Sequence, residues 1–180
     1  MSVNSQQFVS LGANCVVAYW LKEYNLRFEA YPFDWTTVSL ESLINELEQN
    51  FINYSILSVN KLSPKHLTFE NDKPSLIIQN CYKITMAHEV VNPETLNEFS
   101  SNLTKRIDRF LNLHNPTFVR LETANLNQLQ MEKYDKLIEL LDKYFNDYSP
   151  LAYTPLRGYK IIVISLGSER AMLGFTQKLS

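Results

Sequence analysis

Apolar residues near the start of the chain first form a short run and then follow a helical period. Phe8–Leu11 is the run, Gly12 closes it, and the residues from Val16 to about Glu23 have helical periodicity. This pattern predicts a buried strand that turns sharply into a helix. The turn is expected to place Cys15 at or near the N-terminus of that helix.

Apolar spacings of three and four predict three further helices, each with one side facing the core. They are expected from Ser39 to about Asn50, from Asn92-Pro93 to about Asn115-Pro116, and from about Gln128 to Phe145. Ser39 and Asn92 are of the residue types that cap helix N-termini, and proline suits the first helical position. Gly167-Ser168 is expected to start a last helical segment.

Extended segments are expected between these helices. Thr117–Leu121 is a short strand, and Tyr159–Leu166 is a nearly continuous β-branched run of the kind found in the middle of a parallel sheet. Leu67–Phe69 and Ser75–Ile78 flank the turn-forming residues Glu70–Pro74, which predicts an antiparallel hairpin.

Alternating strands and helices predict an α/β fold with a largely parallel central sheet flanked by helices, together with the hairpin. A chain of 180 residues, 45% of them hydrophobic, can bury one core, so a single domain over residues 1–180 is expected. Ligands of such sheets bind outside the carboxyl ends of the strands. That rule places Cys15, Arg120 with Glu122, and Gly167-Ser168 along one rim.

Charge and composition exclude several classes of partner. With 17 basic and 19 acidic residues, the net charge of −2 provides no field that would attract nucleic acid. No run approaches the length of a membrane span, and Met1–Gln7 is polar and uncharged, unlike a signal peptide. We therefore expect a soluble, cytoplasmic protein that binds neither nucleic acid nor membranes.

The two cysteines, Cys15 and Cys81, form neither a disulfide framework nor a zinc-binding spacing. No metal and no cofactor are expected, and the sequence does not indicate an oligomeric state. Unpaired N–H groups and the helix dipole favour an anion at a helix N-terminus. A thiol at the position of Cys15 should therefore lose its proton more readily than one in a plain core. Cys15 is the candidate nucleophile.

A nucleophilic cysteine needs a base, and the chain has three histidines. His66 belongs to what looks like a surface connection, and His114 is more simply explained as a helix-ending residue. His88 follows the extended run Tyr82–Met86, where loops carry functional groups into clefts. A histidine at a strand end is more often structural, but by elimination His88 is the best candidate base.

Two further charged residues lie in apolar surroundings. Asp34, between Phe33 and Trp35, should be partly buried and need a partner, although a turn-forming role is the simpler interpretation. Arg120 interrupts an apolar strand and should pair with an anion. A core carboxylate such as Asp34 or Glu122 is at least as good a partner as a substrate.

Two motifs in the first third of the chain resemble those of a known protein family. Val-Ser-Leu-Gly-Ala-Asn-Cys at residues 9–15 and Tyr-Pro-Phe-Asp-Trp at 31–35 occur with Leu26-Arg27 and a helix ending at Asn50-Phe51. Together they resemble a family of bacterial and viral proteins of unknown function described as papain-like cysteine peptidases. The resemblance covers most of the chain and implies a cysteine followed later by a histidine, which Cys15 and His88 match.

The chemistry that follows is a thiolate–imidazolium mechanism. His88 would take the Cys15 proton, and the thiolate would attack a peptide or other acyl carbonyl to form a thioester. Backbone N–H groups at the helix start, with Asn14, would form the oxyanion hole, and Arg120 is the other candidate for contacting substrate. Asp34 is the candidate for orienting the imidazole. Glu89, where family members tend to have Asp, would point to the opposite face of a strand from His88.

Two other functions stay open. One is a cysteine-dependent acyltransferase or esterase built on the same sheet. The other is a non-catalytic module that binds a sugar nucleotide or phosphate at the helix N-termini near Asn14 and Gly167-Ser168, with Cys15 as an inert buried side chain. With only 4 glycines and no glycine-rich phosphate loop, the chain gives little support to nucleotide binding.

Overall fold

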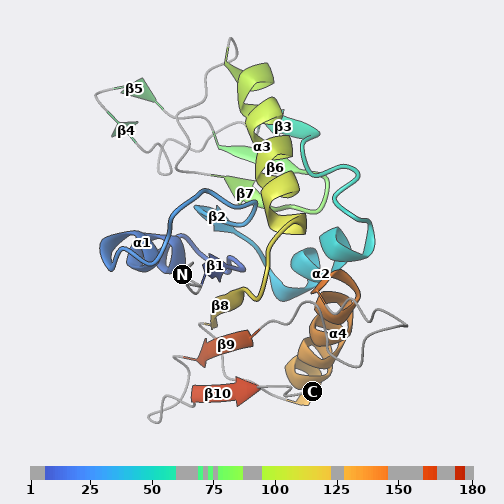
Figure 1. Cartoon of the computed structure of the whole chain (residues 1–180). Helices are drawn as coiled ribbons and strands as arrows, with labels where there is room; N and C mark the ends of the chain where they lie inside the picture. The colour runs from blue at the N-terminus through green and yellow to red at the C-terminus, as the bar shows by residue number, and fades with distance from the viewer. Residues whose placement is uncertain are drawn as a thin grey trace.

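The protein has a mixed α/β fold (Figure 1). The computed structural model describes residues 7–59, 69–70, 73–74, 77–86, 95–122, 128–145, 160–165 and 173–176. Within these ranges the chain forms four helices and ten strands. The strands make two four-stranded sheets and one separate pair.

The first sheet has the strand order β1-β8-β9-β10. Its members are β1 (Phe8–Ser10), β8 (Thr117–Glu122), β9 (Lys160–Ser165) and β10 (Leu173–Thr176). β1, β8 and β9 run parallel, whereas β10 is antiparallel to β9. The carboxyl ends of β1 and β8 therefore meet at one edge of the sheet, as the rim prediction requires.

The second sheet is antiparallel throughout and has the order β2-β7-β6-β3. Its strands have only two or three residues: β2 (Thr36–Thr37), β3 (Leu57–Val59), β6 (Ile78–Asn80) and β7 (Thr85–Met86). The separate pair consists of β4 (Phe69–Glu70) and β5 (Lys73–Pro74), which are antiparallel. The hairpin prediction holds in part: the pairing is antiparallel, but Glu70, Lys73 and Pro74, expected in the turn, form the strands. Ile78, expected in the second strand of the hairpin, belongs to β6.

The prediction of one largely parallel central sheet is wrong. Among the described strands, parallel pairing is confined to β1, β8 and β9, and a second, antiparallel sheet stands beside them. The short strands of that sheet lack the long apolar runs from which strands are predicted, and the tight turn between β6 and β7 permits only antiparallel pairing. The prediction of a last helical segment starting at Gly167-Ser168 is also wrong in part, since residues 173–176 form the strand β10. A single domain over residues 1–180 stays a prediction.

All four described helices were expected from the apolar spacing. They are α1 (Val16–Glu23), α2 (Leu40–Glu48), α3 (Leu96–Leu111) and α4 (Gln128–Phe145). Ser39 caps α2 as predicted, whereas α3 has Thr95 at its N-cap and Asn92-Pro93 lies outside the described residues. None of these helices is long and apolar enough to span a bilayer.

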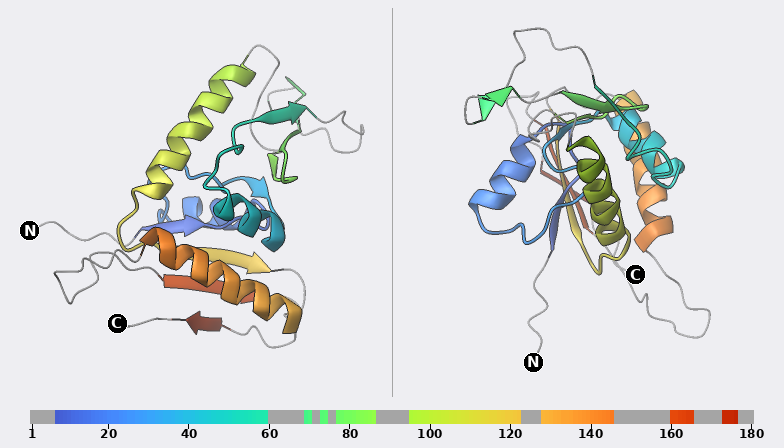
Figure 2. Two further views of the ribbon diagram at one scale, coloured as in Figure 1. Left: turned by 90° about the vertical axis from the view of Figure 1, so that its right-hand side faces the viewer. Right: turned by 90° about the horizontal axis from the view of Figure 1, so that it is seen from above.

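The helices cover both faces of the first sheet (Figure 2). α1 lies on one face and packs Val17 and Leu21 against Val119 and Leu121 of β8. The larger core lies on the other face, between the sheet and the remaining helices. Phe118 of β8 belongs to this core, so neighbouring β8 residues serve different cores, as strand alternation requires.

Aromatic rings fill the middle of the larger core. Neighbouring ring centroids lie 5.2–6.5 Å apart, mostly in tilted or edge-to-face arrangements. The rings are Phe33, Phe51, Tyr54, Phe110, Phe118, Tyr144 and Phe145. Phe33 of the Tyr-Pro-Phe-Asp-Trp motif is therefore an anchor that fixes Asp34 relative to the core.

Candidate active site around Cys15

The turn that precedes Cys15 depends on a glycine. Gly12 has φ +74°, and its N–H donates to Ser10 Oγ at 3.1 Å. A Cβ on Gly12 would stand 2.1 Å from Val38 Cγ1 and 3.2 Å from Thr36 Oγ1. No larger residue fits there, and Ala13 continues the left-handed backbone with φ 75°. The turn at Gly12 therefore packs tightly against Thr36 of β2 and against Val38, the first residue after β2.

Cys15 occupies the N-cap position of α1, so the predicted strand–turn–helix arrangement is confirmed. Asn14 Oδ1 accepts the N–H of Val16 at 3.0 Å, and the first helical hydrogen bond runs from Tyr19 N to Cys15 O. The thiol is half-buried and free, and Cys81 is free and exposed. The sulfur thus lies at the positive end of the α1 dipole.

Asp34 is almost completely buried, with 1% of its surface exposed. Its Oδ2 accepts from Arg27 Nε and from Tyr31 N, both at 2.8 Å. Its Oδ1 is buried without a hydrogen-bond donor in the described part of the chain. Burial raises the pKa of Asp34, and Arg27 with the Tyr31 N–H offsets only part of that rise. The expected need for a partner is confirmed by Arg27, and Oδ1 has no donor among the described residues.

The motif around Asp34 is a compact turn. The guanidinium of Arg27 lies 5.7 Å from the ring centroid of Trp35, which has the unusual φ of 59°. Thr36 Oγ1 donates to Phe33 O at 2.8 Å, and Tyr54 donates through its hydroxyl to Pro32 O. These contacts hold Asp34 at the entrance to β2.

Arg120 is fully engaged with protein groups. Its Nε donates to Glu122 Oε1 at 2.6 Å, Nη1 to Leu11 O at 2.9 Å and Nη2 to Val38 O at 3.1 Å. Of the two carboxylates considered as partners, Glu122 is therefore the one in contact. A buried guanidinium needs such contacts, because leaving it unpaired is costly. A direct contact between Arg120 and a substrate stays a prediction.

Two parts of the candidate site meet at β2. Gly12, three residues before Cys15, packs against Thr36 and Val38. Thr36 in turn pairs with Met86 of β7, the last described residue before residues 87–94. β2 therefore has the Cys15 turn and the end of β7 as neighbours.

Several predicted site residues lie outside the described residues. These are His66, His88, Glu89 and Gly167-Ser168. His114 is described and exposed, but α3 ends three residues earlier, at Leu111, with Asn112 as its C-cap, so the helix-ending role expected for His114 belongs to Asn112. Within the described ranges no group of three or more His, Cys, Asp or Glu residues could hold a metal ion.

Two polar residues of structural importance escaped the sequence analysis. Tyr134 O–H donates to Glu122 Oε1 at 2.7 Å, but its place in the apolar stripe of α4 made it look like a plain core residue. Glu46 is fully buried and accepts from Asn80 Nδ2 at 2.9 Å. Its spacing of three from Leu43 puts it on the buried face of α2, and that spacing could have revealed it.

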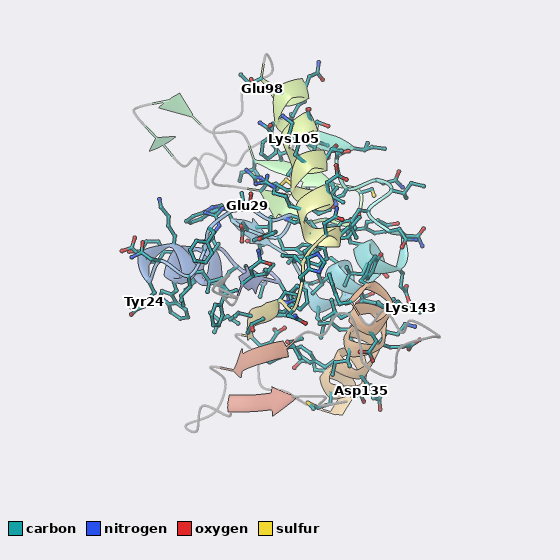
Figure 3. The ribbon with its side chains drawn as sticks, viewed as in Figure 1. Tyr24, Glu29, Glu98, Lys105, Asp135 and Lys143 are labelled. Atoms are coloured by element: carbon teal, nitrogen blue, oxygen red, sulfur yellow. The ribbon has the colours of Figure 1, made fainter. Side chains whose placement is uncertain are left out.

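The outer surface of α1 is aromatic. Tyr19, Trp20 and Tyr24 are exposed, and Figure 3 shows Tyr24 at the outer end of the helix. α1 buries only Val17, Ala18 and Leu21. The helix that begins at Cys15 thus has one side on the sheet and one side open.

Comparisons with known proteins agree with the two sequence motifs. The family model described as "Putative papain-like cysteine peptidase (DUF1796)" matches residues 6–151. An uncharacterized protein of Acanthamoeba polyphaga mimivirus is 29% identical over 159 residues, covering 77% of this chain and 71% of the relative. No solved structure matches the chain at the same level of significance.

Proposed function

Since the chain belongs to the family with this description, we propose that it is a cysteine-dependent hydrolase of the peptidase type, with Cys15 as nucleophile. The observation that carries the proposal is the position of Cys15. It stands at a helix N-cap after a left-handed turn whose first residue, Gly12, has no room for a side chain. Such a position presents the sulfur beyond the carboxyl end of a strand, beside the backbone N–H groups at the start of the helix.

His88 is the proposed base. It follows Met86 by two residues, which limits the separation of their Cα atoms to about 7 Å. Met86 pairs with Thr36, and Thr36 contacts the Gly12 turn. The covalent reach of the chain therefore allows His88 to approach both Cys15 and Asp34.

Asp34 is the proposed partner that orients the imidazole. Its buried Oδ1 lacks a donor among the described residues, and the N–H of a neutral or charged imidazole would supply one. Glu89, the alternative, is adjacent to His88 and would point the other way along an extended chain. The unsatisfied oxygen favours Asp34.

The oxyanion would be stabilised at the start of α1. Asn14 Oδ1 and the Val16 N–H already bond to each other. The groups proposed to donate to an oxyanion are therefore Asn14 Nδ2 and the backbone N–H of Cys15.

The reaction would proceed in two steps. His88 takes the thiol proton and the sulfur attacks the acyl carbon, and the imidazolium then protonates the leaving group to give a thioester. Water, deprotonated by His88, attacks the thioester and releases the acid and the thiol. An acyltransferase or esterase would share the thioester and differ in the acceptor or the leaving group.

Alkylation by iodoacetamide across pH, read at each cysteine by mass spectrometry, tests the proposal. We expect Cys15 to react at pH 6 at least about tenfold faster than Cys81, because a thiol next to a base is activated as a nucleophile and an isolated surface thiol is not. Cys81 is a free, exposed thiol in the same molecule and serves as internal reference.

The histidine assignment is tested in the same assay. His88→Ala should reduce Cys15 alkylation at pH 6 to the rate of Cys81, whereas His114→Ala, at an exposed position, should leave it unchanged. Protection of Cys15 until the protein is denatured would contradict the enzymatic function. Equal profiles for the wild type and His88→Ala would contradict the role of His88.

A further inference from the structure

The guanidinium of Arg120 joins two segments that are far apart in the sequence. Leu11 immediately precedes the Gly12 turn, and its carbonyl accepts from Arg120 Nη1. Val38 follows β2, and its carbonyl accepts from Arg120 Nη2. The bonded residues are 109 and 82 positions away from Arg120, so these contacts are purely tertiary.

The two segments also enclose Gly12. Val38 Cγ1 occupies the space that a Cβ of Gly12 would need, and Leu11 N donates to Val119 O at 2.9 Å. The backbone at Leu11 is therefore bonded to β8 through both Val119 and Arg120, and the backbone at Val38 is bonded to β8 through Arg120. A shift of either segment would displace the turn that carries Cys15.

We propose that Arg120 is the positioning residue of the catalytic turn. It fixes the Leu11 and Val38 carbonyls with one rigid guanidinium and thereby sets where Cys15 stands relative to the β2 segment that follows Asp34. The proposal rests on the proposed function for its catalytic meaning. It assigns Arg120 an action through the backbone and not a contact with substrate.

Arginine suits this role because its planar fork directs donors along separate, fixed directions. Glu122 Oε1 holds the Nε side of the fork at 2.6 Å, and Tyr134 O–H supports the same oxygen at 2.7 Å. Lysine would retain the charge and the pairing with Glu122, but its single ammonium cannot reproduce the three-directional contact. Arg120→Lys therefore tests the geometry of the three contacts while the positive charge is kept.

The experiment compares wild type, Arg120→Lys and Tyr144→Phe. Tyr144 lies on α4, and its hydroxyl oxygen is 2.6 Å from Leu47 O and 2.8 Å from Asn50 Oδ1, so Tyr144→Phe is a control that loses tertiary hydrogen bonding remote from Cys15. In Arg120→Lys we expect Cys15 alkylation at pH 6 to fall about tenfold or more, since small misplacements of a reacting group cost orders of magnitude. Alkylation of Cys81 should stay the same in all three proteins.

Amide hydrogen exchange over residues 11–16 is the second measurement, and it does not require an active enzyme. Exchange there should accelerate in Arg120→Lys beyond its change in global stability, and it should not in Tyr144→Phe. If wild-type Cys15 is no more reactive than Cys81, the proposed function fails, while accelerated exchange still supports the positioning role. A folded Arg120→Lys with wild-type alkylation and exchange overturns the positioning role alone.

Glu122→Gln covers the case in which Arg120→Lys does not fold. It weakens the hold on Nε and leaves both carbonyl contacts available. We expect faster exchange over residues 11–16 and a smaller loss of Cys15 reactivity than in Arg120→Lys. Wild-type behaviour of Glu122→Gln in both measurements would then overturn the proposal.

Discussion

The backbone between β1 and α1 concentrates its constraints in two adjacent residues. Gly12 and Ala13 both have left-handed φ values, and only Gly12 also lacks room for a side chain. For L residues this region is unfavourable by roughly 1–2 kcal/mol. A substitution at Gly12 should therefore cost much more stability than one at Ala13.

Gly12→Ala should be strongly destabilising. The new methyl would meet Val38 Cγ1 at 2.1 Å, and the φ of +74° would add backbone strain. We expect a loss of at least about 2 kcal/mol in the free energy of unfolding, because overpacking and strain act together. Urea denaturation followed by circular dichroism measures it.

Ala13→Gly is the matched control. Glycine accepts φ 75° without strain, which offsets its larger entropy in the unfolded chain, so stability should change by less than about 1 kcal/mol. A Gly12→Ala protein as stable as Ala13→Gly would show that the turn can rearrange.

At the scale of helices and strands, the start of α2 shows how a single side chain caps a helix. Ser39 Oγ accepts the N–H of Ser42 at 3.0 Å, and the two hydroxyl oxygens lie 2.8 Å apart. Ser39→Ala removes the cap and should cost about 1 kcal/mol of stability. Ser42→Ala keeps its backbone N–H and should cost clearly less, and thermal unfolding of both variants compares them. Equal losses would mean that the pair of hydroxyls, and not the cap, stabilises the helix.

The helices and the parallel strands of the first sheet could be predicted from the sequence, whereas the two-residue strand β2 could not. All four described helices follow directly from apolar spacing, because a helix shows its buried face through a repeating period. β2 has only Thr36 and Thr37, too few residues to show any period. Its place beside Gly12 and Met86 comes from tertiary contacts, which leave no mark in the local sequence.

Within the candidate site, too, some features could be predicted from the sequence and others could not. The position of Cys15 could be predicted from Gly12 and the adjacent helical pattern. The partner of Arg120 could not, since both Asp34 and Glu122 satisfied the same electrostatic requirement. Only the distance from Arg120 Nε to Glu122 Oε1 distinguishes them.

At the scale of the whole molecule, Glu46 couples α2 to the antiparallel sheet. Its Oε2 accepts from Asn80 of β6, and its Oε1 is buried without a donor among the described residues. Burial raises the pKa of Glu46 from 4.5 to about 7, an effect that the Asn80 hydrogen bond only partly opposes. The folded protein thus prefers the protonated acid below neutral pH.

This preference makes stability depend on pH. The folded-state pKa lies above the unfolded value, so the contribution is complete below pH 4.5 and is lost as pH rises through about 7. Between pH 5 and 9 the wild type should lose roughly 3 kcal/mol at most from this group. Urea denaturation at each pH gives the curve.

Glu46→Gln should flatten that curve, because the amide is a neutral mimic of the protonated acid. Glu48→Gln, at an exposed position of the same helix, should run parallel to the wild type. Parallel curves for the wild type and Glu46→Gln would assign the pH dependence to other groups.

The chain has two tryptophans, Trp20 and Trp35, and neither belongs to the aromatic cluster of the larger core. Trp20 is exposed on α1 five residues after Cys15, and Trp35 directly follows Asp34 against Arg27. The rings described in the core cluster are phenylalanine and tyrosine, which are nearly silent under excitation at 295 nm. Intrinsic fluorescence at that wavelength therefore reports on the segments around Cys15 and Asp34, and candidate compounds can be titrated against the unlabelled protein before any turnover assay exists.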